Sequence, residues 1–277
     1  MDRELHFSIE GDLDMRFYSA LSGGVNPPRA YPHHIENTIE LFILVEGDVS
    51  FAVESRVYRM SPGDIILTKP NEMHHCITNS ATVNHHYCFY FKPSPHSIFE
   101  SFLEHSFGCD NLISPVEEDR TTILDLASKI DTAENNRENS LDVLALVMQL
   151  LAAVRRNIGK NVDSEALPEA LELAFSEMDE HISENISIDE LCAKLFISYS
   201  TLARLFKKHL GTTPRAYLES KRLAVARRML KDGAGVSETC RAIGFSDSSS
   251  FIRLFKQRFG ETPLKYSQKQ VNFAKST

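Results

Sequence analysis

The sequence predicts an α+β protein with two domains: an N-terminal antiparallel β-barrel with following helices, and a C-terminal all-α domain. Short β-compatible segments separated by turn residues fill residues 30–92, and helical periodicity begins at about residue 97. A chain of 277 residues is long enough for each domain to bury its own core. The third observation is an internal repeat near the C-terminus, which predicts two copies of one small helical motif.

The strand signal consists of short apolar segments that are separated by turn residues. The strongest turn is Ser61-Pro62-Gly63-Asp64. Several short strands at this spacing favour a small antiparallel barrel or sandwich. The expected strands cover residues 40–46, 49–54, 57–60, 65–68 and 83–92.

Helical periodicity and capping residues predict the rest of the chain. The expected helices cover residues 97–107, 117–130, 140–158, 168–183, 188–195, 200–210, 214–231, 236–243 and 248–259, with a last helix from Pro263. A polar stretch separates the two parts. We therefore expect domains at 1–160 and 169–277, joined by a linker at 161–168.

Charge is distributed unevenly along the chain, whose net charge is −8. From Ile186 to the end there are 17 Lys and Arg against 7 Asp and Glu, a net charge of +10, so the preceding residues carry −18. Such asymmetry indicates a basic nucleic-acid module joined to a part with another task, although a solvated basic face explains the charge equally well.

Several classes of protein are disfavoured by composition. No apolar run approaches the roughly 18 residues that a membrane span needs, and the N-terminal residues lack an apolar signal-peptide core. The five cysteines form no Cys-x-x-Cys pair, which argues against a structural zinc site or a redox motif. We expect a cytoplasmic protein with no membrane partner.

The internal repeat carries the main functional signal. Leu205–Pro214 matches Leu254–Pro263 at a shift of 49, whereas Cys192 matches Cys240 at a shift of 48. The second copy therefore has one extra residue, either at its turn or at the start of the following helix. Each copy has a short helix with a small residue, a turn and a second helix, which is the layout of a helix-turn-helix.

The second helix of each copy has one apolar and one polar face at about 100° per residue. Arginine on the polar face can pair with guanine through its planar fork, serine can reach base edges or phosphate, and lysine suits phosphate neutralisation. An ordinary amphipathic surface helix is the alternative for one copy, but two matching faces favour DNA binding. The outward residues are Ser200, Arg204 and Lys207 in the first copy, and Ser249, Arg253 and Lys256 in the second.

The helix at 214–231 lies between the two copies. Its 18 residues give a rod of roughly 27 Å. A rod of that length can hold two recognition helices about one turn of DNA apart, roughly 34 Å.

The segment from about 180 to 268 resembles the AraC/XylS family of transcription regulators. The resemblance implies base-contacting positions in both helices. It departs from the family at Phe196, where the family often has glycine, and Ala203 is too short to reach far, so the first motif is expected to read DNA mainly through Arg204. The residues that carry the resemblance are Ser198-x3-Leu202-x-Arg204-Leu205-Phe206-Lys207, Gly211-Thr212-Thr213-Pro214 with Tyr217-Leu218 and Arg222, Gly244-Phe245-Ser246-Asp247 through Phe251-x-Arg253-Leu254-Phe255-Lys256, and Gly260-x-Thr262-Pro263-x2-Tyr266. The implied contact positions are Ser200, Ala203, Arg204, Ser248, Ser249, Ser250 and Arg253.

Residues 30–92 are similar to the cupin-like sensory domain of many members of this family. The similarity is carried by His34-x-Glu36-x3-Glu40-x6-Gly47, Pro62-Gly63-Asp64 and Pro70-x3-His74. It implies that His34, Glu36, Glu40 and His74 line or border an effector pocket. The same four residues could form a site for iron, manganese or zinc, but we predict no metal and no cofactor.

Histidine pairs occur at 33–34, 74–75 and 85–86. Alternation along a strand points the two rings of a pair to opposite faces, so no pair is a ready-made chelate. His85 and His86 adjoin Tyr87, Phe89 and Phe91 and are assigned to the barrel wall.

The sequence thus predicts a DNA-binding regulator, not an enzyme, that responds to an unidentified small molecule. The alternatives are a metal-dependent cupin enzyme with a helical interaction domain, and a constitutive DNA binder whose barrel only dimerises. The expected partners are double-stranded promoter DNA, the effector, RNA polymerase and a second copy of the chain. The copy is expected to pair through the helix at 140–158, where Leu146 and Leu150 widen the apolar face.

Overall fold

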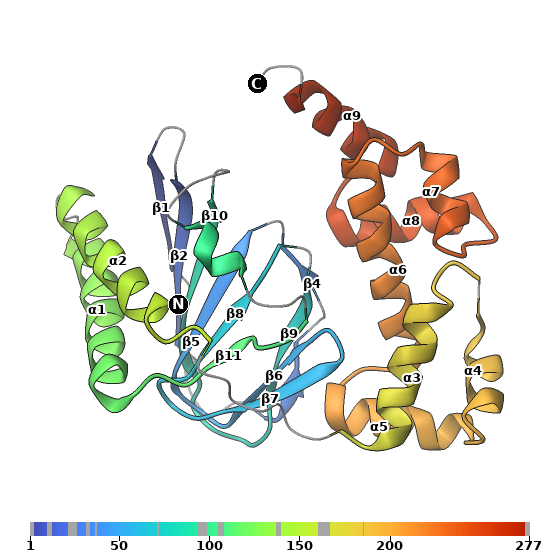
Figure 1. The fold of residues 1–277 in the computed structure, drawn as a ribbon, viewed down its shortest axis with the longest axis horizontal. Helices are drawn as coiled ribbons and strands as arrows, with labels where there is room; N and C mark the ends of the chain where they lie inside the picture. Colours follow the sequence, from blue (N-terminus) through green and yellow to red (C-terminus); the bar gives the residue numbers. More distant parts are fainter. Residues whose placement is uncertain are drawn as a thin grey trace. The chain divides into compact units, whose positions relative to one another are not determined.

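The structure is a computed structural model, and contacts divide it into an N-terminal unit, Met1–Ala166, and a C-terminal unit, Leu167–Thr277 (Figure 1). Among the described helices, none is long and apolar enough to cross a membrane. The expected linker at 161–168 falls mostly outside the described residues. These are 3–9, 13–21, 27–31, 34–36, 38–70, 72–93, 99–104, 108–136, 140–159, 167–184 and 186–274.

The described strands of the N-terminal unit pair antiparallel in two sheets. The larger sheet has the order β1-β2-β10-β5-β8-β11, and the smaller has the order β3-β9-β6-β7, with β4 also paired to β9. The strands are β1 (Arg3–Ile9), β2 (Leu13–Leu21), β3 (Arg29–Ala30), β4 (His34–Ile35), β5 (Ile39–Glu46), β6 (Val49–Val53), β7 (Arg56–Met60), β8 (Ile65–Thr68), β9 (Met73–Thr78), β10 (His85–Pro93) and β11 (Leu112–Ile113).

Three substantial strands were overlooked in the sequence: β1, β2 and β9. The omission of β2 is the most serious, because this strand pairs with both β1 and β10 and buries Met15 and Phe17 completely. Leu13, Met15 and Phe17 alternate with polar residues, so the period-two signal was present. β9 is almost completely buried, but its polar pair His74 and His75 interrupts the apolar pattern that would have indicated a strand.

Two apolar clusters use opposite faces of the larger sheet. One contains residues of both sheets, such as Phe42 and Phe51, and therefore lies between them. The other covers the outer face of the larger sheet with α1 (Glu117–Asn136) and α2 (Ser140–Arg155), which are the green helices of Figure 1. The sheet is thus buried on both faces, which explains the uninterrupted apolar run of β5.

This arrangement places the aromatic residues of β10 and corrects one expectation. Tyr87, Phe89 and Phe91 pack in the cluster under the helices. Leu150 is fully buried in the same cluster, so it cannot widen an outward face of α2. In the region expected to be helical at 97–107, the described residues contain only the short 3-10 helix η1 (Glu100–Leu103), and residues 97–98 and 105–107 lie outside the description.

The described elements of the C-terminal unit are all helical. The sequence predicts the helices α3 and α9 but not what they pack against. In the structure α3 packs against α4 and α5, and α9 packs against α6 and α8. Each helix-turn-helix therefore has a third helix that completes its core. The helices are α3 (Glu169–Glu180), α4 (Ile188–Lys194), α5 (Tyr199–Leu210), α6 (Pro214–Lys231), α7 (Val236–Ala242), α8 (Ser248–Phe259) and α9 (Pro263–Ala274).

Candidate nucleic-acid interface and effector site

The first helix-turn-helix is formed by α4 and α5, and side-chain caps fix the start of both helices. Ser187 and Glu190 form a reciprocal capping box at α4. Ser198 caps α5 by accepting a hydrogen bond from the Thr201 amide at 3.2 Å. Gly211 ends α5 in the left-handed conformation, with a φ of 63°. These caps determine where the exposed face of α5 begins and ends.

The second helix-turn-helix is formed by α7 and α8. Asp247 caps α8 by accepting hydrogen bonds from the amides of Ser249 and Ser250 at 3.0 and 2.8 Å. The turn before α8 spans residues 243–247, whereas the turn before α5 spans 195–198. The extra residue of the second copy therefore lies in its turn, which resolves the alternative left open by the sequence.

The outward faces of α5 and α8 have the composition that the repeat predicts. Leu202 and Phe206 are fully buried in α5, as are Phe251 and Phe255 in α8. Ser200, Arg204, Lys207, Ser248, Ser249, Arg253 and Lys256 are exposed, whereas Ala203 and Ser250 are partly buried. All nine sequence-predicted positions thus lie on or beside the two exposed helix faces, and seven of them are exposed.

Aromatic side chains hold both helices against the rest of their motifs. Phe206 of α5 meets Phe175 of α3 and Tyr217 of α6, with ring centroids 5.7 and 5.5 Å apart. In the second motif Phe255 of α8 meets Tyr266 of α9 at 5.8 Å. Aromatic pairs at such distances add about 0.5–1.5 kcal/mol beyond their area burial. The exposed faces therefore rest on rigid cores.

Phe196 distinguishes the turn of the first motif. Its φ is +54°, and its side chain is 95% exposed. The equivalent residue of the second motif is Gly244, with a φ of +68°. Only glycine adopts this conformation without steric strain, so the departure noted in the sequence is a strained backbone position with an exposed aromatic ring.

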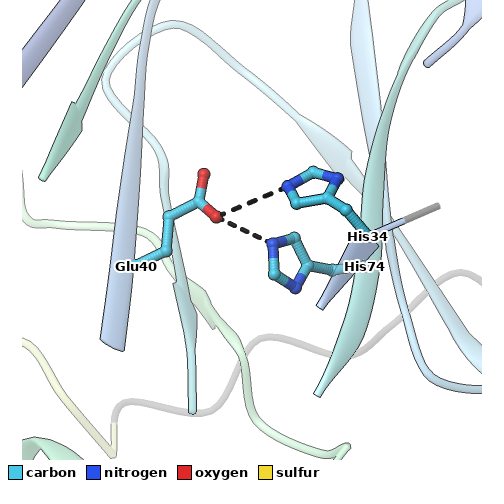
Figure 2. Close-up of side chains that lie close together, drawn as sticks. All are labelled: His34, Glu40 and His74. Carbon is cyan, nitrogen blue, oxygen red and sulfur yellow. Dashed lines mark hydrogen bonds and ion pairs between the residues drawn. The ribbon is translucent and has the colours of Figure 1, made fainter. Parts of the chain in front are cut away.

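His34, Glu40 and His74 meet in the N-terminal unit (Figure 2). Strand register brings them together, since His34 pairs with His74 across β4 and β9, and Tyr90 pairs with Glu40 across β10 and β5. The carboxylate oxygen Glu40 Oε2 lies 2.7 Å from His74 Nε2 and 3.9 Å from His34 Nε2. Tyr90 donates its hydroxyl to Glu40 Oε1 at 3.3 Å.

Burial and charge oppose each other at this cluster. Glu40 is 2% exposed and His74 is not exposed at all. Burial by itself raises the pKa of Glu40, but the charge of His74 and hydrogen bonds from His34 and His74 hold it well below its ordinary value. Burial lowers the pKa of His74, yet the charge of Glu40 and hydrogen bonds to Glu40 and the Glu72 carbonyl raise it overall. The two residues form a buried ion pair.

The cluster differs from the predicted set in two ways. Glu36 follows β4 and is half-buried, but it is not part of the group whose donor atoms all lie within 4.8 Å of one another. Tyr90 was missed, although alternation along β10 places it on the face opposite to Tyr87 and Phe89. Two imidazoles and one carboxylate suit a transition metal chemically. They equally suit a polar ligand, because His34 remains partly exposed beside the buried pair.

Comparison with known proteins matches the two units to two family models. Residues 25–151 match the AraC-like ligand binding domain, and residues 191–269 match a helix-turn-helix domain. The transcriptional activator RhaS of Escherichia coli K12 (DH10B) is 24% identical over 258 residues, which cover 89% of this chain and 91% of that protein. RhaS of Escherichia fergusonii is 25% identical over 87% of this chain and 89% of that protein.

Solved structures also resemble the chain. The structure of ToxT from Vibrio cholerae O395 has a TM-score of 0.38 and 17% identity, and covers 91% of this chain and 96% of its own. The C-terminal domain of the response regulator yesN from Fusobacterium nucleatum is 29% identical over 36% of this chain and 99% of its own, with a TM-score of 0.35.

Proposed function

The chain belongs to the AraC/XylS family of transcription regulators, and from this premise we propose how it reads DNA and senses its effector. It is a DNA-binding regulator with a helix-turn-helix domain and a ligand-binding domain. We propose that α5 and α8 each enter the major groove and that the effector binds at the buried ion pair of the N-terminal unit.

The observation that carries the DNA-reading proposal is the match between the two exposed helix faces. Arg204 and Arg253 stand at equivalent places of α5 and α8, and both are exposed. Each guanidinium can donate two hydrogen bonds to one guanine. Lys207 and Lys256 lie one turn further along and are proposed to neutralise phosphates. The serines at the start of each helix, together with Ala203, complete the proposed contacts.

The effector proposal rests on the chemistry of His34, Glu40 and His74. Two charged groups buried among apolar side chains are uncommon, and such a pair is a candidate functional site because it contributes little net stability. A polar ligand that binds one of these three side chains would break its contact with the others. Because Glu40 lies on β5 and His74 on β9, the loss of their contact would change how the two strands are held together. Glu36, half-buried beside β4, is proposed to border the same site.

Further partners are proposed on the strength of the family. The relatives are called transcriptional activators, which supports RNA polymerase as a partner and the cytoplasm as the place of action. We propose that the chain is not an enzyme, with residues 1–160 sensing the effector and dimerising, residues 161–168 linking, and residues 169–277 binding DNA. The compact units of the structure support a boundary close to this one.

A homodimer is proposed to form through α2. Leu150 is buried and Leu146 packs against the same cluster, so neither forms the outward face of the helix that the sequence predicted. Leu141 is 70% exposed. Ala145 and Ala152 are also exposed, and Met148 is half-buried. These four residues recur at steps of four, three and four, so they form one apolar stripe, on which Leu141, Ala145 and Ala152 are exposed and Met148 packs partly against the core cluster.

Selection of bound sequences from a random double-stranded DNA pool by the full chain tests the DNA proposal. We expect a recovered motif with two conserved blocks centred about 10 bp apart, since one helical turn separates two major-groove contacts on the same face. A motif with a single block would leave one of the two helices without a role in reading sequence.

A further inference from the structure

A hollow of about 820 Å³ lies within the C-terminal unit, between the two helix-turn-helix motifs. Its walls are the start of α4, the start of α5, the first half of α6, and the turn and first half of α8. Small-molecule sites commonly have volumes of about 300–1,000 Å³. The hollow is partly open to solvent, and Ser250 and Arg253 of the proposed DNA-reading face of α8 also line it.

Arg222 of α6 is a buried cation that lines the hollow. It is only 8% exposed. Its Nη2 donates to the Ile186 carbonyl at 3.3 Å, whereas its Nε is buried without a hydrogen-bond partner among the described residues. Leaving a charged donor buried and unsatisfied is unfavourable, so such a group in a native protein calls for a missing acceptor.

The other walls of the hollow are of two kinds. Leu218, Phe245 and Leu254 supply apolar surface. The acidic groups near them are already engaged: Glu219 accepts a hydrogen bond from Arg215 at 3.1 Å, and Asp247 caps α8. Asp189 also lines the hollow, in the first turn of α4, where the helix dipole favours a negative charge. Among the described residues none of these carboxylates forms an ion pair with Arg222, although burial lowers the pKa of Arg222 and the charge of Glu219 offsets part of that effect.

We propose that this hollow binds a small organic carboxylate with an apolar body, with the carboxylate on Arg222 and the body against the apolar walls. The buried Arg222 guanidinium, whose Nε has no acceptor among the described residues, suits a carboxylate, which can accept two parallel hydrogen bonds from an arginine. Tyr199 and Arg253 also line the hollow. Arg253 is a proposed base-reading residue, so a carboxylate bound in the hollow should compete with DNA. This competition rests on the proposed function.

The direct test is a fluorescence anisotropy titration of the full chain with 2-naphthoate as the probe. The chain contains no tryptophan, so the probe can be excited without protein background. We expect saturable binding that weakens about tenfold or more in Arg222→Gln, because a charge-assisted hydrogen bond is lost. The uncharged analogue 2-naphthalenemethanol should bind about tenfold more weakly than naphthoate. Equal binding by Arg222→Gln, or equal binding of the two probes, would overturn the proposal.

Two further variants keep the test decisive. Ile188→Phe adds bulk to the wall of the hollow, leaves Arg222 in place and keeps the chain free of tryptophan, so it should abolish naphthoate binding. It replaces Arg222→Gln as the test if circular dichroism shows that Arg222→Gln is unfolded. Lys231→Gln removes an exposed cation outside the hollow and should not change the affinity. Loss of naphthoate binding in Glu40→Gln would place the probe in the N-terminal unit and overturn the assignment.

The competition is measured with the DNA selected by the chain. Saturating naphthoate should weaken DNA binding at least tenfold for the parent chain and have no effect on Arg222→Gln. Unchanged DNA affinity with naphthoate bound would overturn the competition, while the proposed base contacts would stand or fall on their own variants. If Arg222→Gln weakens DNA binding without naphthoate and flattens its salt dependence, the anion on Arg222 is a DNA phosphate, and the carboxylate assignment is wrong.

Discussion

Glu40 and His74 lie 34 residues apart in the sequence, yet their side chains meet 2.7 Å apart in the interior of the N-terminal unit. Glu40 lies on β5 of the larger sheet and His74 lies on β9 of the smaller sheet, so the two side chains approach each other from different sheets. Neither residue is more than 2% exposed, so the charged form of each is stabilised by the opposite charge of the other rather than by water. The contact therefore couples the two sheets, and its strength depends on pH.

Glu40→Gln should destabilise the N-terminal unit, by roughly 3–5 kcal/mol near pH 6, because it leaves His74 buried without its counter-charge. The pKa of His74 is raised above its ordinary 6.5, so its contribution is complete below that pH and is lost as pH rises through the folded pKa. The pKa of Glu40 is lowered from 4.5, so its contribution is complete above 4.5 and is lost only in stronger acid. Thermal melts should show the difference between parent and variant shrinking above pH 6.5, whereas parallel pH curves would contradict the ion pair.

Phe196→Gly should stabilise the C-terminal unit by about 0.5–1 kcal/mol. The substitution removes the strain of a positive φ, and the side chain it removes is 95% exposed. Phe196→Ala is the matched control, since it removes the ring and keeps the strain, and it should leave stability nearly unchanged. Urea unfolding followed by circular dichroism measures both. A less stable glycine variant would mean that the ring contributes contacts.

Lys207→Ala and Lys256→Ala should weaken binding to all DNA sequences about equally. Each should reduce the slope of log affinity against log salt by about one, because each removes one neutralised phosphate. Lys231→Ala removes an exposed lysine that is not on either reading face and serves as the control. Anisotropy titrations at several salt concentrations give the slopes. If the three variants share the parent slope, α5 and α8 do not approach the backbone as proposed.

Leu141→Glu combined with Met148→Glu should convert a dimer to a monomer at micromolar concentration. Both residues lie on the outward stripe of α2, and a charge there would be buried at the interface. Lys129→Glu on the exposed face of α1 is the control for added negative charge. Sedimentation velocity distinguishes the states. A monomeric parent would end the dimer proposal, and a dimer that tolerates both glutamates would move the interface elsewhere.

The C-terminal unit was more predictable from sequence than the N-terminal one, for physical reasons. Helix faces repeat locally, so Leu202 and Arg204 could be placed on opposite sides from their spacing alone. Caps such as Thr213 and Pro214 fixed the start of α6 at the expected residue. The functions of α3 and α9 were not visible, because their packing partners are distant in sequence.

The larger sheet was harder to predict because it is buried on both faces. A continuous apolar run such as residues 41–45 of β5 carries no sign of which residue points inward. The motif around His34 and Glu40 nevertheless identified three members of the buried cluster. Alternation along β10 gives the face on which Tyr90 lies, but its pairing with Glu40 depends on the register of β10 against β5, which no local pattern in the sequence specifies.

The central claim is that α5 and α8 both read base sequence, and DNA selection with single arginine variants tests it most directly. Arg204→Ala and Arg253→Ala should each lose roughly 1–3 kcal/mol of specific affinity and relax preference at one base position. The two relaxed positions should lie about 10 bp apart, in different blocks of the recovered motif. Retention of the parent preference by either variant, or relaxation of the same position by both, would contradict the account.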